Sequence, residues 1–191
     1  MIRLCYPFSR RLCVGFALCA TLVWMGSCSR AATNLPPALA RLNQSIYFRA
    51  WAGDGGRLAA FVMLDFVTPT NAVPDLSVNP YIFWHRGPGA NERFSVIFIA
   101  QSSRQRSLPD WKSDVSLGDR TWSSRLQFLD VSRSTFSSRI TVTGIIARDE
   151  LERAAKSTEL RALLFTYTGS DSLLFAPSTP ARISALLDAT R

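Results

Sequence analysis

The chain has 191 residues, 47% of them hydrophobic, and a formal net charge of +8. This apolar fraction excludes a wholly disordered protein, and the length suits one domain behind a short targeting segment. The arginines are spread among acidic residues instead of being concentrated on one recognition element, as they usually are in nucleic-acid binders, so we expect no nucleic-acid partner.

The first 27 residues have the organisation of a signal peptide. Arg3, Arg10 and Arg11 precede an uncharged apolar run over residues 12–25. A positive segment followed by a run of this length is typical of export signals, whereas a membrane-spanning helix needs about 20 apolar residues. All four cysteines lie within the first 28 residues. After removal of the signal peptide no pair would remain, which excludes a disulfide-stapled domain.

The end of the apolar run reads Met25-Gly26-Ser27-Cys28-Ser29. It resembles the lipobox of bacterial lipoproteins, in which an aliphatic residue and two small residues precede an obligatory cysteine. The resemblance implies a diacylglycerol on Cys28, cleavage before it and acylation of the new amino group, so that two or more acyl chains hold the protein on a membrane. Cleavage after Ala31 is the alternative. Ser29, in place of Asp, implies an outer-membrane location facing the periplasm.

Residues 28–37 are predicted to be a lipidated tether that ends at two prolines, and residues 38–191 a single globular domain. A helical turn or two is expected over residues 38–43. Alternation predicts strands over 46–52 and 58–67, which the glycine-rich turn at 53–56 joins into a hairpin.

Three prolines over residues 68–80 indicate a surface loop. Strands are predicted over 81–85 and 94–100, on either side of a Gly-Pro-Gly turn at 87–89. The polar stretch 101–120 is expected to be irregular, with turns that include Gly118-Asp119.

Residues 122–128 and 136–142 share the pattern aromatic, two serines, arginine and alternating apolar residues. This echo predicts paired strands that reverse around 132–135. Acidic residues early and basic residues late predict a helix over 148–156.

Strands are predicted over 161–168 and 172–175, followed by a helix that Ser178 or Thr179 caps and that ends near Ala189. The fold class that follows is β-rich α+β: an antiparallel sheet or β-sandwich of about six to eight strands with a C-terminal helix.

No catalytic constellation is recognisable. His85 is the one histidine of the chain, and it follows Trp84 at a strand end, where a half-exposed hydrogen-bonding role is expected. Metal sites need several clustered ligands and a Ser-His-Asp triad needs its serine elbow, so we expect no catalytic residue, metal or cofactor.

Aromatic residues are the remaining candidates for a binding surface. A groove for a peptide, glycan or lipid chain could use seven of them, with Trp111 and Trp122 the preferred contacts because they lie in or beside the polar stretch. The seven are Tyr47, Trp51, Tyr81, Phe83, Trp84, Trp111 and Trp122.

These observations favour a non-enzymatic, lipid-anchored periplasmic protein that binds or positions a partner in an envelope or secretion assembly. Its size resembles that of the small lipoproteins of secretion machines, an analogy that rests on anchor and size alone. Two alternatives stay open: a cell-wall hydrolase with two distant carboxylates, and a carrier of an apolar ligand.

Overall fold

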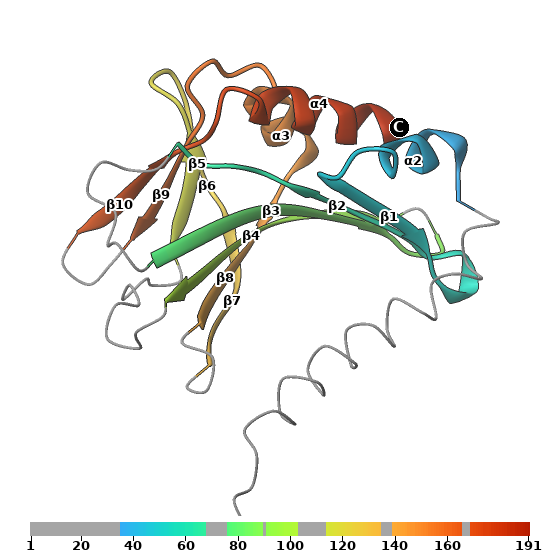
Figure 1. Ribbon diagram of the computed structural model, residues 1–191, viewed down its shortest axis with the longest axis horizontal. Helices are drawn as coiled ribbons and strands as arrows, with labels where there is room; N and C mark the ends of the chain where they lie inside the picture. The colour runs from blue at the N-terminus through green and yellow to red at the C-terminus, as the bar shows by residue number, and fades with distance from the viewer. Residues whose placement is uncertain (1–34, 68–75, 90, 103–113, 135–138, 166–168) are drawn as a thin grey trace, which may run out of the picture.

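Two antiparallel sheets form most of the domain (Figure 1). The computed structural model describes residues 35–67, 76–89, 91–102, 114–134, 139–165 and 169–191. The predicted signal peptide, Cys28 and most of the tether therefore lie outside the described residues. The β-rich α+β fold with a C-terminal helix is confirmed, although the described residues form ten strands because several are only three to five residues long.

The larger sheet has the strand order β1-β2-β3-β4-β8-β7, and the smaller sheet has the order β10-β9-β5-β6. The strands of the larger sheet are β1 (Phe48–Ala52), β2 (Leu58–Met63), β3 (Leu76–Arg86), β4 (Glu92–Ser102), β8 (Arg139–Ile146) and β7 (Gln127–Ser134). Those of the smaller sheet are β10 (Ser170–Leu174), β9 (Arg161–Phe165), β5 (Val115–Gly118) and β6 (Ser123–Arg125). The α-helices are α2 (Pro37–Leu42), α3 (Arg148–Ala154) and α4 (Thr179–Ala189).

The predicted hairpins β1–β2 and β3–β4 are confirmed. Between β1 and β2 the chain turns through a short 3-10 helix, η2 (Asp54–Gly56). Gly55 and Gly56 have φ angles of 69° and 77°, a region in which a side chain would be strained. The glycine run therefore forms the turn that joins β1 to β2.

The predicted loop over residues 68–80 is wrong at its end, because Leu76–Pro80 belongs to β3. Pro80 lies where the neighbouring strand β2 leaves the ladder. The N–H of Leu64 donates to the carbonyl of Pro80 at 3.0 Å, and proline has no N–H to return to this neighbour. The proline therefore sits where the β2–β3 ladder ends, and does not interrupt the strand.

The two sheets are joined on both sides of a common core. On one side β6 runs into β7 through Leu126, which packs over Gly144 of β8; a Cβ on that glycine would lie 2.8 Å from the Cβ of Leu126. On the other side Phe66 and Phe175 form an isolated bridge beyond the ends of β2 and β10. The Leu76–Pro80 segment and the short strand β5 are the strands that the sequence pattern missed.

Helix α4 covers the core with one apolar face. Ile183, Leu186 and Leu187 are at most 3% exposed, as their spacing predicts. Ser178 is the N-cap residue, but the expected capping hydrogen bond from its side chain is not made. None of the described helices has the length and hydropathy that crossing a bilayer requires.

The outer edge of the larger sheet, strand β1, is partly occupied by a side chain. The amide of Asn43, just after α2, accepts a hydrogen bond from the N–H of Ala50 at 2.6 Å and donates one to the carbonyl of the same residue at 2.8 Å. These are the two bonds that an additional strand would make at this position. At the middle of β1, the side chain of Asn43 thereby occupies the backbone N–H and carbonyl of Ala50 that a neighbouring strand would otherwise bind.

Candidate functional site

The larger sheet has one face on the core and one face on which none of the described helices packs (Figure 1). Along β3, Ile82 and Trp84 are at most 1% exposed, whereas Tyr81, Phe83 and His85, which alternate with them, are half-buried on the opposite side. In Figure 1 the helices α2, α3 and α4 all lie on the core side of this sheet. We call the other side the open face.

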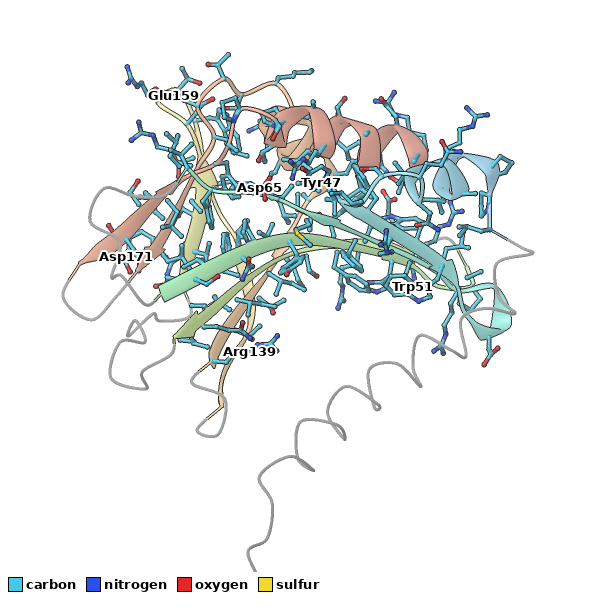
Figure 2. The ribbon with its side chains drawn as sticks, in the orientation of Figure 1. Tyr47, Trp51, Asp65, Arg139, Glu159 and Asp171 are labelled. Carbon is cyan, nitrogen blue, oxygen red and sulfur yellow. The ribbon has the colours of Figure 1, made fainter. Side chains whose placement is uncertain are left out.

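The strand registers define which side chains share the open face. Its described members on β1, β2, β3, β4 and β8 are Arg49, Trp51, Ala59, Phe61, Met63, Ser77, Asn79, Tyr81, Phe83, His85, Arg93, Ser95, Ile97, Ile99, Gln101, Arg139, Thr141, Thr143 and Ile145. Figure 2 shows Trp51 and Arg139 on this side, and Tyr47 and Asp65 on the side of α4.

Five rings from three strands contact one another at one end of the open face. Trp51 packs on Phe61 and Phe83 with ring centroids 6.2 and 6.1 Å away. The ring of Phe61 also contacts that of Tyr81, with centroids 6.2 Å apart, and the ring of Phe83 contacts that of His85, with centroids 5.7 Å apart. Contacts of this kind contribute about 0.5–1.5 kcal/mol each beyond the buried area. The rings are therefore held in fixed positions by their neighbours.

Aliphatic side chains extend the aromatic cluster across the sheet. Met63 and Ile97 lie on either side of Tyr81 in one row of the register, and Ile99 and Ile145 adjoin them on β4 and β8. With strands about 4.8 Å apart and about 3.4 Å per residue, five strands span roughly 24 Å by up to about 37 Å. That size is comparable to the roughly 800 Å² that each partner buries in a standard protein interface.

Three arginines stand around the apolar centre of the open face. Arg49 is on the edge strand β1, Arg93 begins the β4 side of the face, and Arg139 begins β8. The guanidinium of Arg49 donates to the backbone carbonyls of Phe48 and Ser45 at 2.8 and 3.4 Å. The described side chains of the open face on β1, β2, β3, β4 and β8 include no aspartate or glutamate, while the register of β7 places Asp130 on the same face, opposite Thr143.

Two polar atoms of this face are buried without a hydrogen-bond partner among the described residues. They are Nδ1 of His85 and Nε of Arg139. The hydrogen bond expected for His85 at the strand end is thus not made by Nδ1. Such atoms are uncommon in folded proteins. Nε of Arg161 on the smaller sheet is in the same condition, so this feature is not confined to the open face.

The aromatic residues singled out in the sequence separate into three environments. Trp51, Tyr81 and Phe83 come together on the open face, with Phe61, which the sequence analysis missed although it alternates with buried residues of β2. Trp84 is fully buried on the core side. Tyr47 lies beneath the guanidinium of Arg182, 3.5 Å from its ring centroid.

Trp122 lies in the smaller sheet, away from the open face. Its indole N–H donates to the carboxylate of Asp119 at 3.0 Å, and Ser157 donates to the same oxygen at 2.7 Å. Hydrogen bonds from the backbone N–H and hydroxyl of Thr121, with that of Ser157, hold the pKa of Asp119 well below its usual range. Trp122 therefore helps to fix the β5–β6 turn. Trp111 lies outside the described residues.

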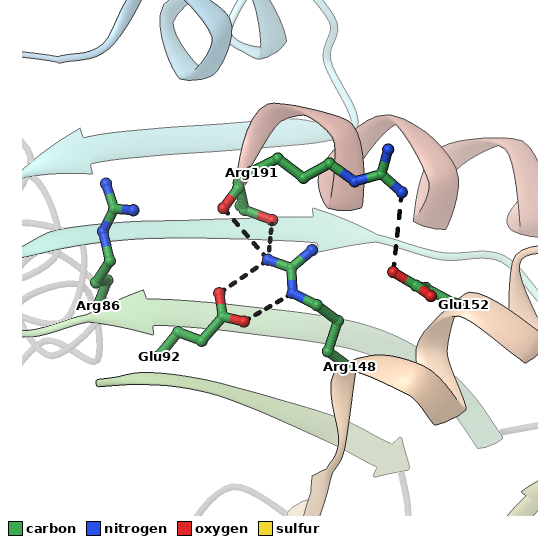
Figure 3. Close-up of a pocket in the computed structure, with 6 residues that line it drawn as sticks. Arg86, Glu92, Arg148, Glu152 and Arg191 are labelled. Carbon is green, nitrogen blue, oxygen red and sulfur yellow. Dashed lines mark hydrogen bonds and ion pairs between the residues drawn. The ribbon is translucent and has the colours of Figure 1, made fainter. Parts of the chain in front are cut away.

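A second polar site surrounds Arg148 at the start of α3 (Figure 3). The guanidinium makes two bonds of 2.7 and 2.8 Å to Glu92, donates to the carbonyls of Leu187 and Thr190, and stacks over Phe94. An open hollow of about 370 Å³ lies beside it, lined by Arg86, Glu92, Arg148, Glu152, Thr190 and Arg191. Because Arg148 bonds both β4 and α4, its evident role is to tie these elements together.

The Arg148 site gives stability an expected pH dependence. Hydrogen bonds from Arg148 above all, and also from Trp84, hold the pKa of Glu92 below the 4.5 of an ordinary glutamate. A lowered pKa stabilises the fold above pH 4.5, and this contribution is lost as the pH falls further. We expect Glu92→Gln to cost about 1 kcal/mol at neutral pH and to flatten the acid side of the stability profile, measured by urea denaturation.

The control for this prediction is a double-mutant cycle with Arg148→Met. Because both substitutions remove the same pair, the double variant is expected to be less destabilised than the sum of the single variants. Additive losses, or an unchanged acid slope in Glu92→Gln, would contradict the assignment.

Comparison of the chain with protein-family models, with curated proteins and with solved structures finds no match. The candidate site is therefore defined by the geometry of this chain alone. Within the described residues, no group of three or more histidine, cysteine, aspartate or glutamate side chains could hold a metal ion.

Proposed function

We propose that this chain is a non-enzymatic binding protein of the bacterial envelope. A lipid on Cys28 tethers it to a membrane, by preference the outer membrane facing the periplasm, and the open face of the larger sheet holds a protein partner. The anchor rests on the lipobox-like sequence, and the binding surface rests on the open face.

The observation that carries the proposal is the composition of the open face. Protein interfaces are enriched in tryptophan, tyrosine, phenylalanine, methionine and arginine, and depleted of lysine, aspartate and glutamate. The described open face has this composition: Trp51, Phe61, Met63, Tyr81 and Phe83 lie together on β1, β2 and β3, and its charged side chains on β1, β2, β3, β4 and β8 are arginines. The aromatic side chains of this face are half-buried, so each keeps apolar surface that a partner could cover.

The two alternative functions have weaker support. A hydrolase with two carboxylates would need one of them to act as an acid with a raised pKa. The hollow at Arg148 does contain Glu92 and Glu152, but Arg148 lowers the pKa of Glu92. A ligand carrier would keep space between the sheets, where the described residues instead place large, fully buried side chains such as Trp84 and Phe98.

Site-specific photo-crosslinking in living bacteria tests the binding surface. A photoreactive phenylalanine analogue would replace Ile97 at the centre of the open face or, as the control, the exposed Ala181 on α4. We expect an adduct of defined mass from position 97 that is absent from position 181. Phe61→Ser in the same chain is expected to abolish it. Equal crosslinking from both positions, or none from position 97, would refute the binding surface.

Lipid attachment has a separate test. Cells grown with a clickable fatty acid would be compared for the wild-type chain, Cys28→Ala and Cys19→Ala. We expect label in the wild type and in Cys19→Ala, and none in Cys28→Ala. Equal labelling of all three chains would refute the anchor and leave the binding surface to be judged on its own experiment.

A further inference from the structure

The arginines on the open face indicate which charge a protein partner of this face has to have. Arg49, Arg93 and Arg139 come from three different strands. The one acidic residue that the described registers place on this face is Asp130 of β7, and its row, through Thr143 and Ile97, contains none of the three arginines. A buried arginine needs a partner that satisfies its charge, because burying an unpaired charge is strongly unfavourable. A protein that covers this face therefore has to supply the negative charge itself.

Seven of the arginines elsewhere in the described structure already have acidic partners. Ion pairs are formed by Arg120, Arg125, Arg148, Arg153, Arg161, Arg182 and Arg191. None of these seven lies on the open face. Arg49, Arg93 and Arg139 form no ion pair among the described residues, as is also true of Arg41, Arg57 and Arg86, so their charges can meet the carboxylates of a partner.

The same charges argue against a second copy of this chain as the occupant. Two open faces that pack on each other would bring six arginines together with only the two aspartates at position 130, and the excess of like charges across such an interface is unfavourable. A lipid surface fits less well too, because insertion requires protruding apolar side chains. The large apolar residues that protrude most in the described structure are Ile46 and Val67, and neither lies on the open face.

We propose that the partner of the open face is a protein surface with an apolar centre and acidic side chains placed to meet Arg49, Arg93 and Arg139. This inference rests on the proposed function, since it specifies the chemistry of the protein held there. Charge pairing at the margin would set the orientation of the partner and accelerate association, while the aromatic cluster would supply most of the buried apolar area.

A defined acidic polypeptide provides the test. The lipidated chain, purified in a neutral detergent, would be titrated into a fluorescent copolymer of glutamate and tyrosine, and into a copolymer of lysine and tyrosine, with anisotropy as the readout. We expect binding of the acidic copolymer alone, weakened at least tenfold when salt is raised from about 0.05 to about 0.5 M, because salt screens exposed charges.

Two triple variants with the same net charge distinguish binding by the arginines of the open face from binding by the overall positive charge of the chain. Arg49→Gln/Arg93→Gln/Arg139→Gln is expected to weaken binding of the acidic copolymer at least tenfold. Arg41→Gln/Arg120→Gln/Arg153→Gln, at exposed positions elsewhere, is expected to stay within about twofold of the wild type. Equal losses in both variants, or equal binding of both copolymers, would overturn the inference.

A lipid surface and a second copy of this chain, the other two possible occupants of the open face, would each give a different experimental result. Binding to phosphatidylglycerol vesicles that depends on the same three arginines, without binding of the copolymer, would identify a lipid surface. A dimer in sedimentation that Phe61→Ser dissociates would identify a second copy. Either result overturns the acidic protein partner. If crosslinking from position 97 persists in the open-face triple variant, the inference fails and the proposed function stands; if position 97 gives no adduct, the proposed function itself fails.

Discussion

Replacing Trp84 by alanine is expected to lower the free energy of unfolding by about 3–5 kcal/mol, the usual cost of removing a large buried aromatic side chain. Trp84 is 0% exposed, and its indole N–H donates to Glu92 at 3.2 Å. Its loss leaves a cavity under α4 and removes a hydrogen bond from the Glu92–Arg148 pair. Urea denaturation followed by near-ultraviolet circular dichroism would measure the change.

Trp51 is the matched control, because it is the same residue type on the opposite face of the same sheet. It pairs with Ala59 of β2, whereas Trp84 pairs with the next residue, Ala60. Since Trp51 is half-buried among the rings of the open face, Trp51→Ala is expected to cost only about 1–2 kcal/mol and to abolish the crosslink from position 97. Equal destabilisation by the two substitutions would mean that the open face is a second core.

Gly118→Ala is expected to destabilise the domain by about 3 kcal/mol, at the upper end of the range for overpacked sites. A Cβ at Gly118 would lie 2.3 Å from the carbonyl oxygen of Trp122 and 2.8 Å from the Cα of Ser123. Both atoms belong to the backbone, so they cannot move away as a flexible side chain would. The turn that Asp119 organises would have to open.

Gly87→Ala is the control for this prediction. Gly87 begins the β3–β4 turn, has no positive φ, and has no atom within 4 Å of the Cβ position. We expect its replacement to change stability by less than about 0.5 kcal/mol, as for other exposed sites without special geometry. The thermal midpoints of the two variants, measured side by side, test the contrast. A small effect of Gly118→Ala would show that the β5–β6 turn is looser than its contacts indicate.

Local patterns predicted most of the elements. Turn glycines at 53–56 and 87–89 located both hairpins, and the spacing of Ile183, Leu186 and Leu187 located the buried face of α4. The repeated serine-arginine pattern was only partly right: its first copy, Ser123–Arg125, forms β6 and pairs with β5, and β7 continues through the predicted reversal to Ser134. The start of β3 was missed because prolines normally interrupt a strand, and Pro80 is accommodated only because β2 leaves the ladder beside it. Beyond this point Phe66 forms a bridge with Phe175, a residue distant in sequence that local patterns do not reveal.

The open face could not be assigned from the sequence. Alternation groups Tyr81 with Phe83 and Ile82 with Trp84, but both groups are apolar, so the pattern does not indicate which one faces the core. The choice depends on where α4 packs and on the insertion of β8 beside β4, neither of which is visible in local sequence. Trp84 was grouped with Trp51 for the same reason, although the two lie on opposite faces of the sheet.

The hydrogen bonds that Asn43 makes with Ala50 bear on how copies of this chain behave when they are crowded. Molecules confined to a surface collide often, and an unprotected strand edge would let neighbouring sheets join into continuous ribbons. An amide seated at the middle of β1 blocks that route with a single side chain. Copies can then stay discrete at high density, and the partner proposed above would be met by the side chains of the open face and not by this backbone edge.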